Sequence, residues 1–79
     1  MHRVEFTVEP FIEGQPGPHV VAPIEALTAS GIEVEVGPFG SSCLVEATAT
    51  ADAVGIIVRE AFARGATHVN IDVALEGLP

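Results

Sequence analysis

A short turn containing glycine and proline joins two strand-like runs near the middle of the chain, and it constrains the fold more than any other stretch. The turn, residues 37–42, is Gly-Pro-Phe-Gly-Ser-Ser. Residues 32–36 alternate apolar and acidic side chains, and residues 43–47 are again strand-like. The glycines would allow positive φ, and the proline presets φ for a turn. We therefore predict a β-hairpin whose tip carries Phe39, a ring that a partner or ligand would cover.

The remaining segments predict a complete small fold around this hairpin. Residues 3–9 and 67–75 alternate apolar and polar side chains, which is typical of strands with one covered face. Apolar positions at helical spacing predict helices over 18–30 and 50–64. Two right-handed β-α-β crossovers joined by a hairpin give the α+β, ferredoxin-like βαββαβ arrangement. Its four-stranded antiparallel sheet has both helices on one face.

The two helices differ in how clearly the sequence marks them. Pro23 would remove a backbone hydrogen bond from the first helix, so we expect its first turn to be irregular. Thr50 is the expected N-cap of the second helix. An apolar row at i, i+3, i+4, i+7 and i+8 is expected to face the core, namely Val54, Ile57, Val58, Ala61 and Phe62.

The strand alternation also predicts which side chains form the uncovered face of the sheet. Most of them are polar, and many are acidic. Such a face is either simply hydrated or the place where a ligand binds. It would carry Arg3, Glu5, Thr7, Glu9, Glu33, Glu35, Ser42, Leu44, Glu46, Thr48, His68, Asn70 and Asp72.

Length and composition predict one domain over residues 1–79 that associates with itself. A hydrophobic content of 48% is high for 79 residues, which favours apolar surface buried between subunits. The single cysteine, Cys43, cannot form an internal disulfide, and its inward position on the third strand indicates a small buried side chain.

The charge balance limits the partners. The chain has eleven acidic residues, three arginines and no lysine, which gives a formal net charge of -8. Nucleic acid and anionic membranes are bound through clustered basic residues, so both are disfavoured, and a neutral or cationic ligand fits better. The sequence has neither an apolar run of about 20 residues nor a basic-then-apolar leader, so we expect a cytoplasmic protein.

Catalytic and metal sites have little support. His68 and Asp72 share a face but lie about 13 Å apart at the rise of a strand, too far to bind one metal ion together. Cys43 has no neighbouring histidine in the sequence to stabilise a thiolate, and Ser41 and Ser42 lack a nucleophile-elbow pattern. We therefore expect that the protein is not an enzyme and needs no cofactor.

The pattern that remains is a small-molecule pocket. Ligand sites generally combine apolar walls with a few polar anchors. Phe11 and Phe39 would supply aromatic faces, while Ser41, Ser42 and Asn70 would supply hydroxyl and amide groups.

At four places the chain resembles the small thiamine-binding, YkoF-like proteins. These are residues 4–10, 18–20, 30–32 and, most specifically, 36–42, whose Gly-Pro-Phe-Gly-Ser-Ser is similar to the family's Gly-Pro-(Met/Phe)-Gly-(Thr/Ser) turn. The resemblance implies a ferredoxin-like fold, homodimers or homotetramers, and cytoplasmic binding of thiamine or its hydroxymethylpyrimidine moiety without catalysis.

The resemblance also implies roles for single residues. Ser41 and Ser42 stand where the family's turn hydroxyls stand, and Phe39 stands where it has a large apolar residue. The family often has a glutamate at the position of Leu44, so Glu46, two residues further along, would have to contact the aminopyrimidine. The expected ligand-binding residues are Phe11, Phe39, Ser41, Ser42, Glu46 and Asn70.

Two other interpretations of the sequence stay open. The chain could be a structural or regulatory oligomerisation module without a small-molecule ligand. A weaker alternative is an enzyme whose acid/base group is a carboxylate on the sheet, Glu46 or Asp72.

If the chain binds thiamine, the scarcity of basic residues favours unphosphorylated thiamine over its diphosphate as the ligand.

Overall fold

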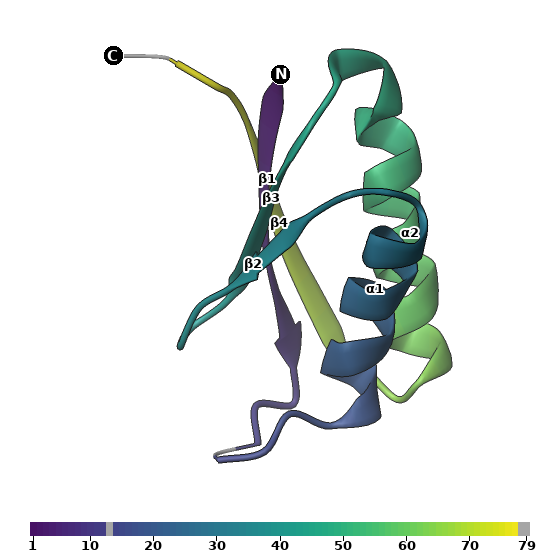
Figure 1. Ribbon diagram of the computed structural model, residues 1–79. Helices are drawn as coiled ribbons and strands as arrows, with labels where there is room; N and C mark the ends of the chain where they lie inside the picture. The colour runs from purple at the N-terminus through teal and green to yellow at the C-terminus, as the bar shows by residue number, and fades with distance from the viewer. Residues whose placement is uncertain (13, 78–79) are drawn as a thin grey trace.

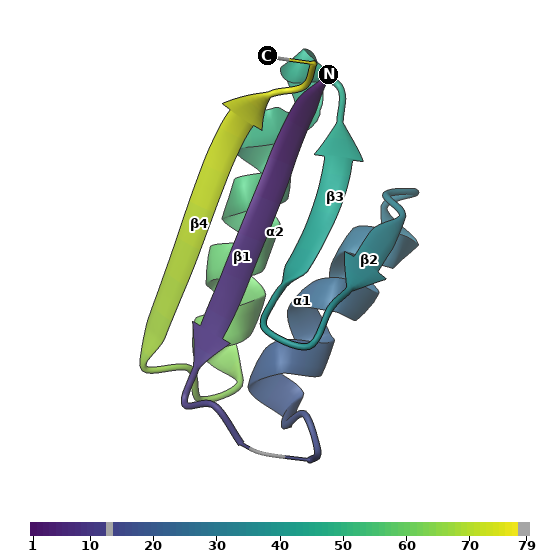
Figure 2. The ribbon, with the colours of Figure 1, turned by 90° about the vertical axis from the view of Figure 1, so that its left-hand side faces the viewer.

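The computed structural model of the chain, which describes residues 1–12 and 14–77, has two layers (Figure 1). A four-stranded antiparallel sheet with strand order β2-β3-β1-β4 forms one layer, and two helices cover one of its faces (Figure 2). The predicted ferredoxin-like arrangement is therefore confirmed. In chain order the elements are β1 (His2–Glu9), α1 (Pro18–Ala29), β2 (Val34–Val36), β3 (Ser41–Val45), a 3₁₀ turn η1 (Ala47–Ala49), α2 (Thr50–Ala63) and β4 (His68–Leu75).

The core lies between the sheet and the helices. The central strand β1 contributes every second residue to it, as the alternation predicted, and the helices contribute the side chains that face the sheet. The other face of the sheet is open (Figure 1). The buried hydrophobic set comprises Val4, Phe6, Val8, Leu27, Cys43, Val45, Ala53, Ile57 and Ala61.

The third strand occupies a different range from the prediction. It begins at Ser41 and ends at Val45, so residues 47 and 48 belong to η1 and are exposed rather than on the sheet. The backbone amide of Ala49 and the hydroxyl of Thr50 both donate to the Glu46 carbonyl. These local hydrogen bonds compete with continued strand pairing. They end the strand before Glu46.

Helix α1 is regular from Pro18, so the expectation of an irregular first turn is wrong. Pro23 lies inside the helix, and its ring is among the fully buried side chains. Packing of this ring offsets the missing backbone hydrogen bond. The helix ends at Ala29, with Ser30 as its C-cap. Gly31 follows with a φ of 86°, and the Ile32 amide donates to the Leu27 carbonyl.

Helix α2 faces the core with a narrower row than predicted. The buried positions are Ala53, Ile57 and Ala61, whereas Val58 and Phe62 are exposed, which corrects their expected core placement. The small side chains of Ala53 and Ala61 in the buried row let the helix lie close to the sheet, so Val58 and Phe62 fall on its flank. The N-cap is Ala49 rather than Thr50, whose hydroxyl instead hydrogen-bonds to Nδ1 of His2 at 2.6 Å.

Strand β4 forms one edge of the sheet and pairs with β1 over its whole length. Val69 and Ile71 are half-buried on the helix side, as predicted, and Asn70 and Asp72 lie on the open face. Within residues 1–12 and 14–77, no helix has the length and apolar character to cross a membrane.

Candidate functional site

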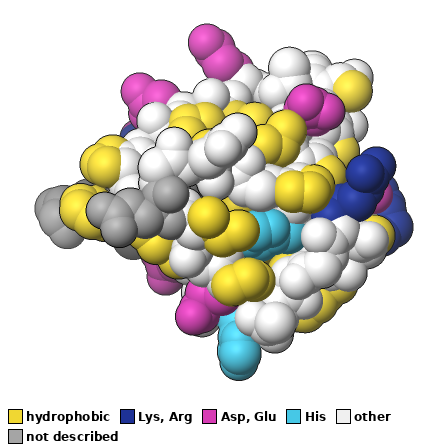
Figure 3. Space-filling view, turned by 90° about the horizontal axis from the view of Figure 1, so that it is seen from below, with side chains coloured by type: hydrophobic (Ala, Val, Ile, Leu, Met, Phe, Trp, Pro, Cys, Tyr) yellow, Lys and Arg dark blue, Asp and Glu magenta, His cyan; other side chains and the backbone are white. Residues whose placement is uncertain are grey.

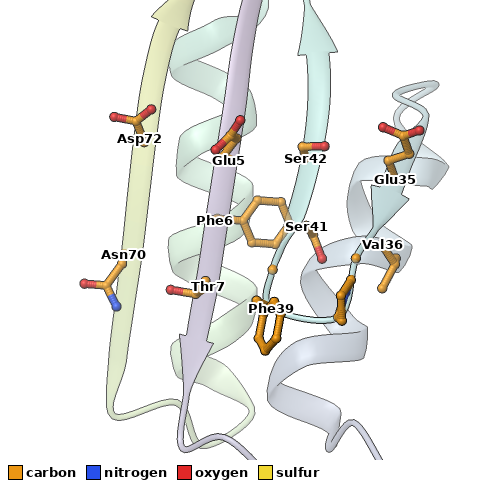
Figure 4. A pocket seen from close by; sticks show the side chains of 13 residues that line it. Glu5, Phe6, Thr7, Glu35, Val36, Phe39, Ser41, Ser42, Asn70 and Asp72 are labelled. Atoms are coloured by element: carbon orange, nitrogen blue, oxygen red, sulfur yellow. The ribbon is translucent and has the colours of Figure 1, made fainter.

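One row of polar side chains crosses all four strands on the open face. The strand register places Glu35 opposite Ser42, Ser42 opposite Glu5, and Glu5 opposite Asp72. Figure 4 shows these four side chains at one level of the sheet. Neighbouring strands lie about 4.8 Å apart, so Glu5 has a hydroxyl on one side and a carboxylate on the other. We call Glu35, Ser42, Glu5 and Asp72 the acidic row.

A second row lies next to it, toward the β2–β3 turn. Thr7 stands opposite Asn70, and the Asn70 side-chain amide donates to the Glu9 carboxylate at 3.3 Å. Beyond them Phe39 projects from the turn, with 86% of its surface exposed (Figure 4). The two rows and the turn line an open hollow of about 690 Å³.

The turn that carries Phe39 packs closely against β1. The Gly37 amide donates to the Gly40 carbonyl at 2.8 Å and closes the turn. A Cβ at position 40 would lie 3.0 Å from Cγ2 of Thr7 and 3.1 Å from the Phe6 carbonyl oxygen, so only glycine fits there without a shift. Neither turn glycine is among those with positive φ, so Gly40 is required for space rather than for its backbone angle.

A smaller hollow of about 250 Å³ lies between this turn and the β1–α1 loop. Phe11, 72% exposed, lines it together with Phe39 and Ser41, and both Phe39 and Ser41 also line the larger hollow. Figure 3 views the molecule from the end where these loops lie and shows several hydrophobic patches among acidic side chains. The two hollows thus form one continuous region with an aromatic end and an acidic end.

His19 holds the loop that carries Phe11. This histidine is buried in the first turn of α1, and its Nε2 lies 2.6 Å from the Pro10 carbonyl oxygen. Its ring also fills the space beside Gly17, where a Cβ would lie 2.7 Å from the histidine Cε1. The ring therefore contacts both ends of the loop. Sequence reasoning missed this role, although a histidine placed directly after a loop rich in glycine and proline was a signal for it.

The carboxylates of the acidic row have no bonded cation in the described part of the chain. Arg3 is engaged by Glu76, with its Nε 3.0 Å from Oε2, and this hydrogen bond and charge raise the pKa of the guanidinium. Arg59 pairs with Glu60 on α2. The three carboxylates of the acidic row, Glu5, Glu35 and Asp72, take part in no ion pair within residues 1–12 and 14–77. The acidic end of the site therefore favours a positively charged ligand.

The structure brings most of the predicted ligand-binding residues together. Phe39, Ser41, Ser42 and Asn70 line the larger hollow, and Phe11 joins it through the smaller one. Ser42 lies on the open face, whereas Ser41 is buried on the helix side, opposite Phe6. Four lining residues were absent from the predicted set although the alternation had already placed them on this face: Glu5, Thr7, Glu35 and Asp72.

Glu46 lies apart from the others. It follows the last residue of β3, at the end of the sheet remote from the Phe39 turn, and lines a different hollow together with Met1 and Glu33. The expected continuation of β3 would have placed Glu46 on the same face as Leu44. The strand ends at Val45, and even a continued strand would leave Glu46 about 13 Å from Ser42, so the structure does not bring Glu46 to the predicted partners.

Neither a metal-binding cluster nor an exposed cysteine is found in the described part of the chain. In the chain outside residues 13, 78 and 79, no three histidine, cysteine, aspartate or glutamate side chains are placed to hold one metal ion. Cys43 is buried, and desolvation raises the pKa of its thiol, which disfavours the reactive thiolate. The arrangement supplies aromatic faces, hydroxyls, an amide and carboxylates on one surface.

Comparison with known proteins identifies the fold. No family model and no curated protein matches this chain. A solved structure of DUF77, a domain of unknown function from Bacillus cereus, is similar with a TM-score of 0.66 and 23% sequence identity. The match covers 92% of this chain and 71% of that chain. At this identity, the likeness shows a shared fold.

Proposed function

We propose that this protein binds thiamine or its hydroxymethylpyrimidine moiety without catalysis, as a cytoplasmic carrier, buffer or sensor. The observation that carries the proposal is the acidic row, which has no bonded cation within the described residues and lines the same hollow as the exposed ring of Phe39. The resemblance of residues 36–42 to the turn of the thiamine-binding, YkoF-like proteins points to the same ligand.

The polar groups of the site suit an aminopyrimidine. This ring is flat and carries both hydrogen-bond donors and acceptors. Thr7 and Ser42 can donate or accept through their hydroxyls, and Asn70 can do both through its amide. Phe39 offers an aromatic face against which the ring would be desolvated.

The charge of the site suits the second half of thiamine. Its thiazolium ring is cationic, and three carboxylates line the hollow. A diphosphate would bring negative charge to the same surface, where no arginine or lysine is among the lining residues. The unphosphorylated ligand should therefore bind more tightly.

The acidic partner of the aminopyrimidine is assigned to Glu5 rather than Glu46. Glu5 lies on the central strand, next to Ser42 and within the hollow that contains Phe39. Glu46 lines a separate hollow. Leu44, which stands where the family often has glutamate, is therefore compensated from the neighbouring strand.

Isothermal titration with thiamine, hydroxymethylpyrimidine and thiamine diphosphate at moderate salt tests this function. Saturable binding of either of the first two is expected, with thiamine diphosphate weaker. Phe39→Ala and Glu5→Gln should each weaken binding about tenfold or more. The matched control Glu46→Gln should leave affinity unchanged. No binding of any of the three ligands would reject the proposal.

A further inference from the structure

Ser41 presents a buried hydroxyl that bonds to nothing in the described part of the chain. Only 8% of the residue is exposed, and its Oγ forms no hydrogen bond within the described residues. Every fully enclosed side-chain nitrogen or oxygen of these residues has a partner, so the Ser41 oxygen is not fully enclosed. It therefore opens to the hollows that Ser41 lines. Figure 4 shows the hydroxyl pointing toward the side of Val36, which also lines the smaller hollow.

The smaller hollow lies on the helix side of the β2–β3 turn, whereas the acidic row lies on the open face. Val8 and Val20 line only the smaller hollow, and Glu5 and Asp72 line only the larger one. Val8 belongs to the buried side of β1, and Val20 lies in the first turn of α1. The two hollows meet at the turn, but their walls have different chemistry.

The walls of the smaller hollow are apolar and uncharged. None of its described lining residues is charged. Phe11, Ile12 and Phe39 are exposed around it, with 72%, 52% and 86% of their surfaces accessible. A charged molecule would lose hydration there without gaining an opposite charge from these residues. The hollow therefore suits a neutral ring that covers the exposed aromatic side chains.

The hollow is formed before any molecule enters it. The hydrogen bond from His19 to the Pro10 carbonyl holds the loop on one side, and the bond from the Gly37 amide to the Gly40 carbonyl closes the turn on the other. Its volume of about 250 Å³ is below the usual range for drug-sized ligands, which indicates a single ring. A preformed site lowers the entropic cost of binding.

The first turn of α1 adds a preference for oxygen. Gly17, the N-cap, lines the hollow and has no side chain that caps the helix. The positive end of the helix dipole favours an electronegative atom over a cation. Pro18, the first residue of the helix, has no N–H, which leaves fewer donors for a phosphate or another anion.

We propose that the smaller hollow is a second binding site, which takes a small neutral aromatic molecule with one hydroxyl group. The ring lies among the apolar side chains near Phe11 and Phe39. The hydroxyl of the bound molecule exchanges a hydrogen bond with Ser41. This site does not depend on the ligand of the proposed function, because neither Glu5 nor Asp72 lines it.

Phenol is the probe that tests this site, and toluene is its matched control. The two molecules have similar size and shape, but toluene carries a methyl group in place of the hydroxyl. Phenol should bind with a dissociation constant of about 1 mM or lower, and toluene should bind more weakly because it cannot replace a water on Ser41. A titration followed by NMR should shift the amide signals of Val8 and Val20. Shifts confined to Asn70 and Asp72, or no shift at all, would overturn the proposal.

Two neighbouring serines separate this site from the acidic row. Ser41→Ala should weaken phenol binding about fivefold and leave toluene binding unchanged. Ser42→Ala is the matched control, because Ser42 lines only the larger hollow, and it should leave phenol binding unchanged. Equal weakening by both variants, or no effect of Ser41→Ala, would rule out Ser41 as the anchor.

Unfolding measurements separate a binding role of the Ser41 hydroxyl from a structural one. The hydroxyl has no hydrogen-bond partner in the described chain, so Ser41→Ala should leave the free energy of unfolding unchanged or raise it. Chemical denaturation without phenol measures this. A clear loss of stability in Ser41→Ala would assign the hydroxyl to the fold and contradict its role as the anchor.

Discussion

Glu5 and Asp72 stand directly opposite each other on the two neighbouring strands β1 and β4, with both side chains on the open face. Neither takes part in an ion pair within residues 1–12 and 14–77. Like charges at this spacing destabilise a sheet unless they are solvated or met by a cation. The fold therefore maintains a local repulsion at the place where the proposed cationic ligand would bind.

Removing one of these charges should stabilise the free protein. Asp72→Asn is expected to raise the free energy of unfolding by a few tenths of a kcal/mol at low salt, with less effect at high salt. Chemical denaturation at two ionic strengths measures this difference. The control Asp52→Asn removes an acid from the first turn of α2 and should be destabilising instead, because that charge favours the helix dipole. A destabilising effect of Asp72→Asn would contradict the repulsion.

Two glycine substitutions should have opposite effects. Gly40→Ala places a methyl group 3.0 Å from Cγ2 of Thr7 and 3.1 Å from the Phe6 carbonyl, so it should destabilise the fold by about 1–3 kcal/mol. Gly55→Ala lies within α2 with nothing within 4 Å of the new Cβ, so it should stabilise by about 0.5–1 kcal/mol. Thermal unfolding of the wild-type protein and both variants measures these changes in stability. Equal changes in stability for Gly40→Ala and Gly55→Ala would show that the close contacts of the turn do not distinguish Gly40 from Gly55.

The strand alternation predicted the site because period two assigns every residue to a face. It placed Ser42, Asn70 and Asp72 on the open face, and the structure brings them to one hollow. It failed at Glu46, because local hydrogen bonds from Ala49 and Thr50 end β3 and the alternation carries no signal for them.

The helix patterns predicted less of the packing. In α2, alanine and valine are both apolar, so the pattern could not show that the row of Ala53, Ile57 and Ala61 faces the core. Side-chain size decided this, since Ala53 and Ala61 allow a closer approach to the sheet than valine or phenylalanine would. In α1, propensity argued against Pro23, but tertiary packing of its buried ring prevailed.

His19 should control the order of the loop that carries Phe11. His19→Ala removes the hydrogen bond to the Pro10 carbonyl and leaves a cavity, so it should destabilise by about 2–3 kcal/mol. Amide exchange of Phe11, Ile12, Gly14, Gln15 and Gly17 should rise more than exchange elsewhere. His68→Ala changes an exposed histidine that hydrogen-bonds to its neighbour Thr67, so it is the matched control and should be nearly neutral. Uniformly faster exchange across the protein would assign His19 to global stability alone.

The Cys43 thiol should react slowly with labelling reagents in the folded protein. Its burial should also make the folded state less stable as the pH rises into the alkaline range. Desolvation raises the pKa of the thiol above its ordinary value of 9.0, so the folded state retains a proton that the unfolded chain loses first. The unfolded state then binds fewer protons, and stability falls as the pH rises above about 9. Thiol labelling at pH 8 should therefore be slow until denaturant unfolds the chain. Cys43→Ala should lessen the alkaline loss of stability, measured by denaturation between pH 7 and pH 10. An unchanged pH dependence in this variant would assign the loss to other groups.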